Sequence, residues 1–379
     1  MTDRVAVVGA GAVGVTAAHD LAAAGADVTV YDRGEPGSGS SGRAAGVLYD
    51  AYAGDVDAAI GARALERFRE LSGEGDFEFV ECPYVFLARE GDAKRAAAIE
   101  ESAERMRRRG RDVSPLSPAE LGERFPTLTG GAEAAAVAEN AGWTDPGNYV
   151  SMMADRAAAA GARFETGAAA DVLLDPPGVA AGGERERFDA VLVAAGAHTK
   201  RVLADAGVAV PLKPYRVQAL TGGARYDGPM CYDATAGIYF RPHPTGLLAG
   251  DGTEPVEADP DAWDRTADGW FVEAIRSGLR ERAGYDLRVE RAWAGLCTAT
   301  PDGNPLLGEL GSEGAPPGAE RGVFVAAGWQ GHGFMRAPAI GEAVAAAMLG
   351  EEGALPTAFD PNRFDGSEEF EIAEGMVID

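Results

Sequence analysis

The sequence predicts an α/β fold combined with antiparallel β structure, in which a discontinuous Rossmann-like domain is interleaved with a second domain built on a mixed or antiparallel sheet. Three observations carry this prediction. A glycine-rich strand–helix–strand pattern occupies residues 5–32. Shorter strand-like segments, separated by Gly, Pro and Asp turns, fill residues 215–300, and α/β character returns at residues 322–349. Because the first pattern resumes after the second, we expect interleaved rather than consecutive domains.

The first pattern has the spacing of a dinucleotide-binding turn. A β-branched run leads into Gly9, Gly11 and Gly14, an Ala-rich helix follows over residues 13–24, and a second strand ends at Asp32. The three glycines permit, in turn, a tight bend, close approach of the backbone to a pyrophosphate, and packing of helix on strand. The helix start offers bare N–H groups, and the acid is placed to accept hydrogen bonds from a ribose. A purely structural turn is the alternative, and the complete register favours the dinucleotide site.

The later segments complete the prediction in chain order. Residues 33–46 form a Gly/Ser-rich loop that enters another helix, and Ser117-Pro118 is a capped helix start. Further helices are expected at 93–109, 151–161, 262–283 and 336–349, and apolar strands at 188–196 and 322–328. These elements predict a nucleotide-binding domain of residues 1–80, 146–214 and 320–365. They predict a substrate domain of residues 81–145 and 215–319, and an acidic, mobile tail of residues 366–379.

The charge balance is strongly acidic. The chain of 379 residues has 60 acidic and 34 basic residues, a net charge of −26. Excess carboxylate with abundant Ala and Gly is typical of proteins adapted to high intracellular salt, where the repulsion is screened. We therefore expect a halophilic protein whose stability falls at low salt, although an acidic surface for a basic partner is the alternative. The sign of the charge argues against nucleic-acid binding.

The scarce cysteines and histidines exclude other classes. Cys82, Cys231 and Cys297 are scattered without CxxC spacing, which indicates a reducing cytoplasm. None of the four histidines is spaced from another His or a Cys as metal ligands are, so no metal site is expected. No apolar run is long enough to cross a membrane and no signal peptide is apparent. We expect a cytoplasmic protein without a transmembrane segment.

Several motifs together resemble one family. They are the Gly9–Gly14 pattern, SGRAAG at 41–46, GWTDPGNY at 142–149, VLVAAGAHT at 191–199, TPDGNPLLG at 300–308 and GWQGHGFMRAPAIGE at 328–342. From Arg4 to about Phe364 the chain is similar to the D-amino-acid oxidase superfamily of FAD-dependent oxidoreductases, which includes glycine oxidase and the sarcosine oxidases. The resemblance implies a discontinuous FAD domain and a substrate domain whose antiparallel sheet covers the flavin.

The resemblance also implies the cofactor contacts. The FAD would be held by Gly9, Gly11, Val13, Gly14, Asp32, Arg33, Ser40, Ser41, Arg43, Ala44, Ala45, Gly46, Ala170, Ala195, Gly196, Gly303, Gly328, Gly331, His332, Gly333, Phe334 and Met335. Arg43 and Gly295 stand where relatives attach the flavin covalently through His or Cys, so the FAD is expected to be non-covalent. A second helix start near Arg336 and Pro338, preceded by glycines, would stabilise negative charge on the flavin.

Departures from the family bear on substrate binding. Cys297 stands where many amino-acid oxidases have an Arg that clamps the substrate carboxylate, and Met335 replaces a Lys of the sarcosine oxidases. Leu248 replaces a Lys credited with activating oxygen, which favours a dehydrogenase over an oxidase. The electron acceptor stays open between oxygen, a quinone and a carrier protein.

Three residues are candidates for catalysis. Tyr239 matches a family tyrosine over the flavin, and Arg241 shares its strand face and could pair with a carboxylate. The alternative for Arg241 is a structural Arg that braces a loop. His332 is expected beside the flavin, either as a base or as a structural residue.

Three functions remain in competition. The first is an FAD-dependent oxidoreductase that moves hydride from a C–H beside nitrogen of an amine or N-methyl amino acid to flavin N5. The second oxidises a 2-hydroxy acid or polyol phosphate and would need a base such as His332 or His243. The third is a flavoprotein of low turnover that assists the assembly of another complex. A small-molecule substrate is expected in the first two cases.

Overall fold

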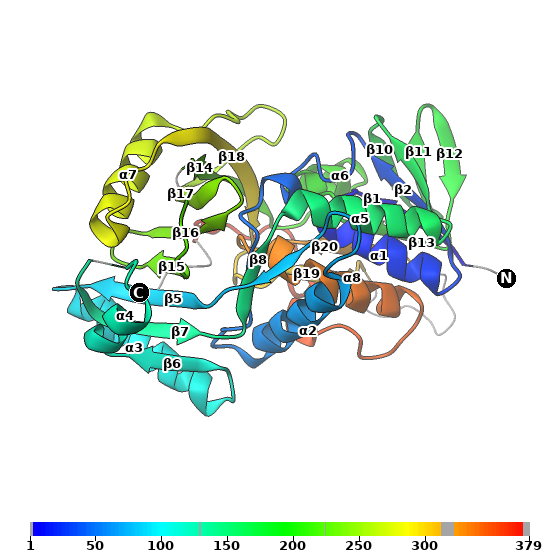
Figure 1. The fold of residues 1–379 in the computed structure, drawn as a ribbon. Helices are drawn as coiled ribbons and strands as arrows, with labels where there is room; N and C mark the ends of the chain where they lie inside the picture. Colours follow the sequence, from blue (N-terminus) through cyan, green and yellow to red (C-terminus); the bar gives the residue numbers. More distant parts are fainter. Residues whose placement is uncertain (1–2, 129, 224, 312–321, 374–379) are drawn as a thin grey trace.

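Strands from separate stretches of the chain form a six-stranded sheet in the order β19-β20-β13-β1-β2-β9 (Figure 1). The computed structural model describes residues 3–128, 130–223, 225–311 and 322–373. Neighbouring strands are parallel except β19, which is antiparallel to β20. The strands are β1 (Arg4–Val8), β2 (Asp27–Asp32), β9 (Arg163–Thr166), β13 (Ala190–Val193), β19 (Leu306–Glu309) and β20 (Val323–Ala327). The Rossmann-like part of the predicted fold is thereby confirmed.

Both faces of this sheet are covered, as parallel sheets require. Val5 and Val7 of β1 belong to a core that includes the helices, whereas Ala6 and Val8 belong to a second core on the other face. The helices are α1 (Ala12–Ala23), α2 (Asp55–Leu71), α5 (Pro146–Ala159) and α8 (Gly333–Met348). The opposite face carries α6 (Thr199–Asp205) and a sheet of β10 (Ala170–Leu174), β11 (Pro177–Ala181) and β12 (Glu184–Arg187).

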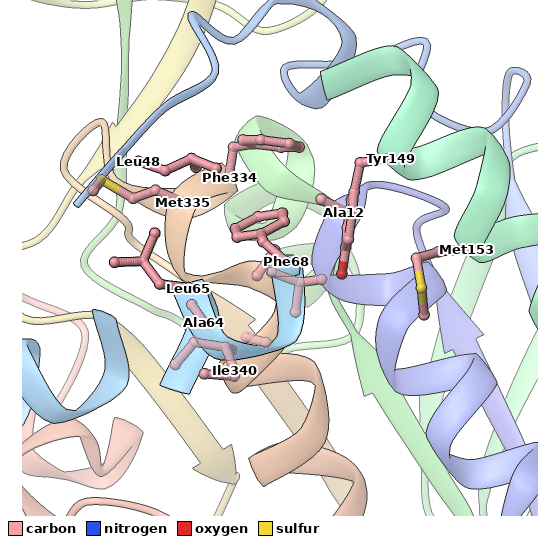
Figure 2. Packing of buried hydrophobic residues seen from close by; sticks show 14 of the residues in the cluster. Ala12, Leu48, Ala64, Leu65, Phe68, Tyr149, Met153, Phe334, Met335 and Ile340 are labelled. Carbon is pink, nitrogen blue, oxygen red and sulfur yellow. The ribbon is translucent and has the colours of Figure 1, made fainter. Parts of the chain in front are cut away.

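Aromatic packing fixes the start of α8 against α2 and α5. The ring of Phe68 lies 5.0 Å from that of Tyr149 and 5.7 Å from that of Phe334, measured between centroids. Figure 2 shows these rings grouped together, with Leu65 and Ile340 nearby. Since large aromatic groups bury the most apolar surface, this cluster anchors the first turn of α8.

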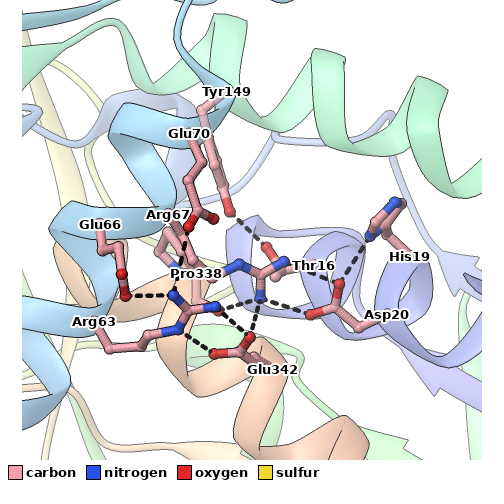
Figure 3. Close-up of polar contacts among 10 residues, drawn as sticks. All are labelled: Thr16, His19, Asp20, Arg63, Glu66, Arg67, Glu70, Tyr149, Pro338 and Glu342. Carbon is pink, nitrogen blue, oxygen red and sulfur yellow. Dashed lines mark hydrogen bonds and ion pairs between the residues drawn. The ribbon is translucent and has the colours of Figure 1, made fainter.

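A charged network joins α2 to α1 and α8 (Figure 3). Arg67 makes two hydrogen bonds of 2.7 and 2.9 Å to the carboxylate of Asp20 on α1, and donates to the carbonyl of Pro338 on α8 at 2.8 Å. Arg63 pairs in the same bidentate way with Glu342 at 2.7 Å. Bidentate pairs fix orientation as well as distance, so α1, α2 and α8 are locked in one arrangement.

An eight-stranded mixed sheet forms the second layer, in the order β18-β14-β17-β16-β15-β5-β7-β6. Its pairs are antiparallel except β15 with β5. The strands are β5 (Tyr84–Arg89), β6 (Val113–Leu116), β7 (Ala132–Ala138), β14 (Lys213–Gly222), β15 (Met230–Asp233), β16 (Ile238–His243), β17 (Gly246–Glu257) and β18 (Val289–Ala299). A small sheet of β3 (Val47–Tyr49), β8 (Ala141–Thr144) and β4 (Phe79–Glu81) lies between the two layers.

Successive side chains of a strand point to opposite faces of the sheet, so one face of this sheet lies in a hydrophobic core and the other can serve a different purpose. Phe240, Leu220 and Ala249 pack with Phe271 and other residues of helix α7 (Gly269–Ala283) in one core. Helix α4 (Pro118–Arg124) also packs on this side, and its predicted capped start is a capping box between Ser117 and Glu120. Helix α3 (Ala93–Arg108) packs on the opposite face of the same sheet. Part of that opposite face of the eight-stranded sheet lines a cavity.

Some predicted boundaries were wrong. Helix α7 begins at Gly269 rather than residue 262, because Arg216 donates to the carbonyls of Asp264 and Thr266 and holds that segment as a loop. Helix α8 begins at Gly333, so Pro338 lies inside it. Strand β19 pairs in the six-stranded sheet although it falls within the stretch assigned to the substrate domain. The domain boundaries themselves stay a prediction.

The described part of the expected mobile tail is docked. The ammonium group of Lys213 donates to the carbonyl of Phe370 at 2.5 Å and lies 4.5 Å from the centre of its ring. Gln330 donates to the carbonyl of Ala373 at 2.9 Å. Residues 366–373 therefore pack on the body of the protein, and residues 374–379 lie outside the described chain.

Candidate active site

A cavity of about 780 Å³ lies between the two large sheets. At one end it is lined by Gly9, Gly11 and Asp32, beyond the carboxyl ends of β1 and β2. At the other end it is lined by His332 and Met335 at the start of α8, and by the free face of the eight-stranded sheet. Ligands of open α/β sheets bind outside the carboxyl ends of the strands, so this cavity is the candidate site.

The glycine turn at the first end leaves no room for side chains. Gly9 has φ +115°, and a Cβ there would lie 2.4 Å from the carbonyl oxygen of Ala194. The N–H of Ala12 donates to Oγ of Ser41 at 3.0 Å, and no side chain caps α1 at Gly11. The helix therefore presents its positive end to the cavity, where a diphosphate would be favoured.

Asp32, which was predicted to contact a ribose, lines the cavity with its carboxylate held by two backbone N–H groups. One carboxylate oxygen accepts from the N–H of Ala10 at 2.7 Å, and the other accepts from the N–H of Gly34 at 2.8 Å. These bonds fix the orientation of the carboxylate. Since an ionised carboxylate has about four acceptor positions, it retains capacity for hydroxyl donors in the cavity.

Tyrosines surround the opposite end. Oη of Tyr49 lies 3.3 Å from Nε2 of His332, and the rings of Tyr49 and Tyr84 are 5.2 Å apart. Burial raises the pKa of both tyrosines well above the usual value, so both keep their hydroxyl protons. The hydroxyl of Tyr84 is fully buried and has no hydrogen-bond partner within the described chain. A ligand with an acceptor group would satisfy it.

His332 is neutral in this environment. Burial lowers its pKa to about 3, with a further contribution from the positive charge of Arg336. Arg336 is itself paired with Asp57 at 2.8 Å, and its guanidinium lies 4.7 Å from the centre of the Tyr52 ring. His332 is therefore a poor proton acceptor at neutral pH.

Most of the predicted site residues gather on this cavity. Its lining contains Gly9, Gly11, Val13, Asp32, Arg33, Ser40, Ser41, Arg43, Ala44, Ala45, Gly46, Ala170, Ala195, Gly196, Tyr239, Gly331, His332, Gly333, Phe334 and Met335. Segments distant in the sequence thus converge as the motifs predicted. Their individual contacts with a cofactor stay a prediction.

Four predicted residues do not line the cavity. A Cβ on Gly14 would lie 1.9 Å from the carbonyl oxygen of Gly9, so this glycine serves helix packing. Gly303 is in the turn before β19 with φ +75°, and Gly328 packs behind the cavity, where a Cβ would lie 2.5 Å from Thr300. The fourth residue is Arg241.

The guanidinium of Arg241 does not face the substrate space, contrary to the prediction. The side chain is 2% exposed and donates to the carbonyls of Ala45 at 2.6 Å, Pro242 at 2.7 Å and Thr144 at 3.3 Å. It also lies 4.8 Å from the centre of the Trp143 ring. Burial lowers its pKa to about 10. The guanidinium therefore joins β16 to the segments before β3 and α5, which is the structural alternative.

Other cavity residues had no motif to reveal them. Tyr49 and Tyr84 reach the site only because β3 and β5 are brought there by non-local pairing. Asp261 and Trp263 line the opposite rim from the loop before α7. An aromatic residue at the end of a predicted strand is too common a pattern to indicate a site.

The cavity fits a dinucleotide cofactor. It joins a side-chain-free turn, an uncapped helix start and an acid at one end to a tyrosine-rich space at the other, across one continuous volume. Within the described residues, no group of three or more His, Cys, Asp or Glu side chains is arranged to hold a metal ion. None of the helices described is both long and apolar enough to span a membrane.

Comparisons with known proteins agree with this site. Residues 4–347 match the model of the DAO family, FAD dependent oxidoreductase. The chain is 29% identical to glycine oxidase of Geobacillus kaustophilus over 391 residues, covering 95% of this chain and 96% of the relative. It is 27% identical to 4-methylaminobutanoate oxidase (formaldehyde-forming) of Paenarthrobacter nicotinovorans over 96% of its own length, but covers 46% of that protein.

Solved structures show the same fold. The L-proline dehydrogenase from P. horikoshii superposes with a TM-score of 0.85 at 27% identity, covering 96% of this chain and 98% of that one. The family model, the cavity and the glycine turn agree from β1 to α8. The chain belongs to the DAO family of FAD-dependent oxidoreductases.

Proposed function

We propose that this protein oxidises an amine or an N-methyl amino acid at the C–H bond next to nitrogen, with non-covalently bound FAD. When bound, FAD supplies the acceptor for the hydride. The substrate loses that hydride and is left as an iminium ion, which water converts to a carbonyl compound and an amine. The named substrates of the relatives, glycine and 4-methylaminobutanoate among them, support the substrate class.

The surroundings of His332 carry this proposal: its side chain is 5% exposed and its Nε2 lies 3.3 Å from Oη of Tyr49. Oxidation of a 2-hydroxy acid or polyol phosphate requires removal of a hydroxyl proton and therefore a base at the reacting end. The pKa of His332, lowered to about 3 by burial, makes it unsuited to that task. His243, the other histidine considered, lines a separate depression with Trp143 and Pro242. A neutral amine has a nitrogen lone pair of its own and needs no such base.

The tyrosines of this end would position the substrate and exclude water. The hydroxyl of Tyr84 has no partner within the described chain, and Tyr239 lines the same space from β16. Asp251 of β17 lines the same cavity, is 8% exposed and has a backbone φ of +119°. Strained backbone persists at functional sites. Close positioning in a water-poor cavity accounts for much of the acceleration in such reactions.

We also propose an acceptor other than oxygen. Leu248, at the position of the Lys of the oxidases, is 3% exposed and packs with Ala219 and Trp293. A buried leucine offers no positive charge to attract or stabilise superoxide.

The test is an anaerobic titration of the holoprotein in molar salt. N-methyl amino acids, simple N-methyl amines, D-amino acids and 2-hydroxy acids are added while the flavin absorbance is followed. Loss of absorbance with the nitrogen compounds alone is the expected result. Loss with 2-hydroxy acids, or with no compound, would overturn the proposal. Slow recovery of the absorbance in air would indicate a dehydrogenase, and rapid recovery an oxidase.

A further inference from the structure

Three arginines contact Trp293 or the adjacent Ala294 at an edge of the cavity. Trp293 of β18 is 9% exposed and lines the cavity, and its Nε1 donates to the carbonyl of Arg43 at 3.0 Å. The guanidinium of Arg291 lies 4.8 Å from the centre of its indole ring. The N–H of the next residue, Ala294, donates to the carbonyl of Arg265 at 2.9 Å. The backbone carbonyls of Arg43 and Arg265 and the side chain of Arg291 are thus all held at this point of the sheet.

Two of these three arginines border the cavity, whereas Arg291 is not part of its lining. Arg43 and Arg265 both line the cavity. Arg43 uses Nη1 for the carbonyls of Ser38 at 2.6 Å and Gly39 at 2.9 Å, while the guanidinium of Arg265 lies 5.6 Å from the centre of the Trp263 ring. No carboxylate within the described residues lies at ion-pair distance from any of the three arginines. Burial and the charges of Arg265 and Arg291 lower the pKa of Arg43.

Such a cluster is unexpected in this chain. The protein has 60 acidic against 34 basic residues, so carboxylates are available for almost any arginine. Arginines elsewhere use them, as Arg33, Arg63 and Arg67 do. Like charges held close without a counterion repel one another, and an anion between them removes that repulsion. In an acidic protein a positive edge also directs anionic ligands to the cavity.

We propose that Arg43, Arg265 and Arg291 form an oxyanion site that binds a carboxylate or phosphate group at the Trp293 edge of the cavity. Planar guanidinium groups bind both anions in a bidentate manner. As a site for the substrate carboxylate, this inference rests on the proposed function, and it places that carboxylate away from the position of Cys297. The other source of the same chemistry is the diphosphate of FAD.

The test uses the double variant R265Q/R291Q, because both side chains are exposed and their replacement leaves the core intact. The holoprotein is titrated with acetate at constant ionic strength while the flavin absorbance is followed. The dissociation constant of FAD is measured separately from the fluorescence of released flavin. R225Q/R280Q, which removes two exposed arginines paired with Asp227 and Asp286, is the control for net charge. R265K/R291K tests whether positive charge restores binding.

Each outcome decides the proposal. At least tenfold weaker acetate binding with unchanged FAD affinity, partly restored in R265K/R291K, supports a carboxylate site. At least tenfold weaker FAD binding with acetate binding unaffected supports an oxyanion site that serves the diphosphate. Unchanged values in both titrations, or equal losses in R225Q/R280Q, overturn it. Neither measurement requires turnover, so failure of the amine substrates to reduce the flavin would leave this result independent.

Discussion

Oη of Tyr49 lies 3.3 Å from Nε2 of His332, in a buried contact between β3 and the residue that precedes α8. The contact holds a neutral imidazole beside the space left for the substrate. It connects the small central sheet to the helix start, so a change at either residue reaches both the cavity and the fold.

The pH dependence of stability tests the neutral state of His332. In the folded protein His332 becomes protonated only when the pH falls to its pKa of about 3 or below. In the unfolded chain the same side chain is protonated below about pH 6.5. Stability is therefore lost as the pH falls below 6.5, by about 1.4 kcal/mol per pH unit from this group. His332→Asn removes the group, so the loss of unfolding free energy between pH 6.5 and 5 should be about 2 kcal/mol smaller than in the parent.

Urea unfolding at the two pH values measures this difference. His19→Asn is the composition control, since this residue lies on α1 outside the cavity and pairs with Asp20. An equal pH dependence in the parent and His332→Asn would show that the folded protein protonates His332 normally. That result would also restore His332 as a candidate base.

The local parts of the fold were predictable because local sequence determines them. The Gly9–Gly14 turn needs space and a positive φ that only glycine tolerates, and the capping box of Ser117 and Glu120 satisfies its own helix start. Helix α1 accordingly starts one residue from its predicted position.

The remaining site depends on contacts across the chain. Arg241 and Tyr239 share a strand face, as the two-residue period requires, but only the arginine meets the carbonyls of Ala45 and Thr144. Tyr84 reaches the cavity through the pairing of β5 with β15. Neither fact follows from periodicity, because both depend on where non-adjacent segments dock.

The packing role of Gly14 predicts a severe effect of a single methyl group. In Gly14→Ala the new Cβ would lie 1.9 Å from the carbonyl oxygen of Gly9, a backbone atom that cannot move aside as a flexible side chain would. The expected loss is about 3 kcal/mol of unfolding free energy, with a lower ratio of flavin to protein. Gly122→Ala is the matched control, since that helical position has no atom within 4 Å and should gain about 0.5–1 kcal/mol. Normal flavin content and stability in Gly14→Ala would contradict the packing role.

The contacts of Asp261 lead to a prediction for the rate at which FAD is released. Its carboxylate accepts from Arg33 at 2.7 Å, from His198 at 3.2 Å and from Arg201, and it lines the cavity rim. These contacts join the loop before α7 to the six-stranded sheet. Asp261→Asn should release FAD about three- to tenfold faster, because exposed ion pairs contribute about 0.2–1 kcal/mol each.

Stopped-flow fluorescence of the released flavin measures this rate. The matched control is Asp227→Asn, which removes an exposed carboxylate paired with Arg225 and absent from the cavity lining. High salt should reduce the difference between parent and Asp261→Asn, since exposed charges are screened. Equal release rates at low salt would show that the rim contacts do not retain the cofactor.

Substitution of Arg241 distinguishes a structural role of this residue from a substrate-binding role. Replacing it with Met leaves the carbonyls of Ala45 and Thr144 without their donor in a buried position, at a cost of about 3 kcal/mol of unfolding free energy. Because the guanidinium does not line the cavity, folded Arg241→Met should need the same substrate concentration for half-reduction of the flavin as the parent. Arg225→Met, at an exposed site, controls for the loss of charge and should retain full stability. The opposite pattern, unchanged stability with a hundredfold higher substrate requirement, would return Arg241 to the role of carboxylate clamp and would require its side chain to turn toward the cavity.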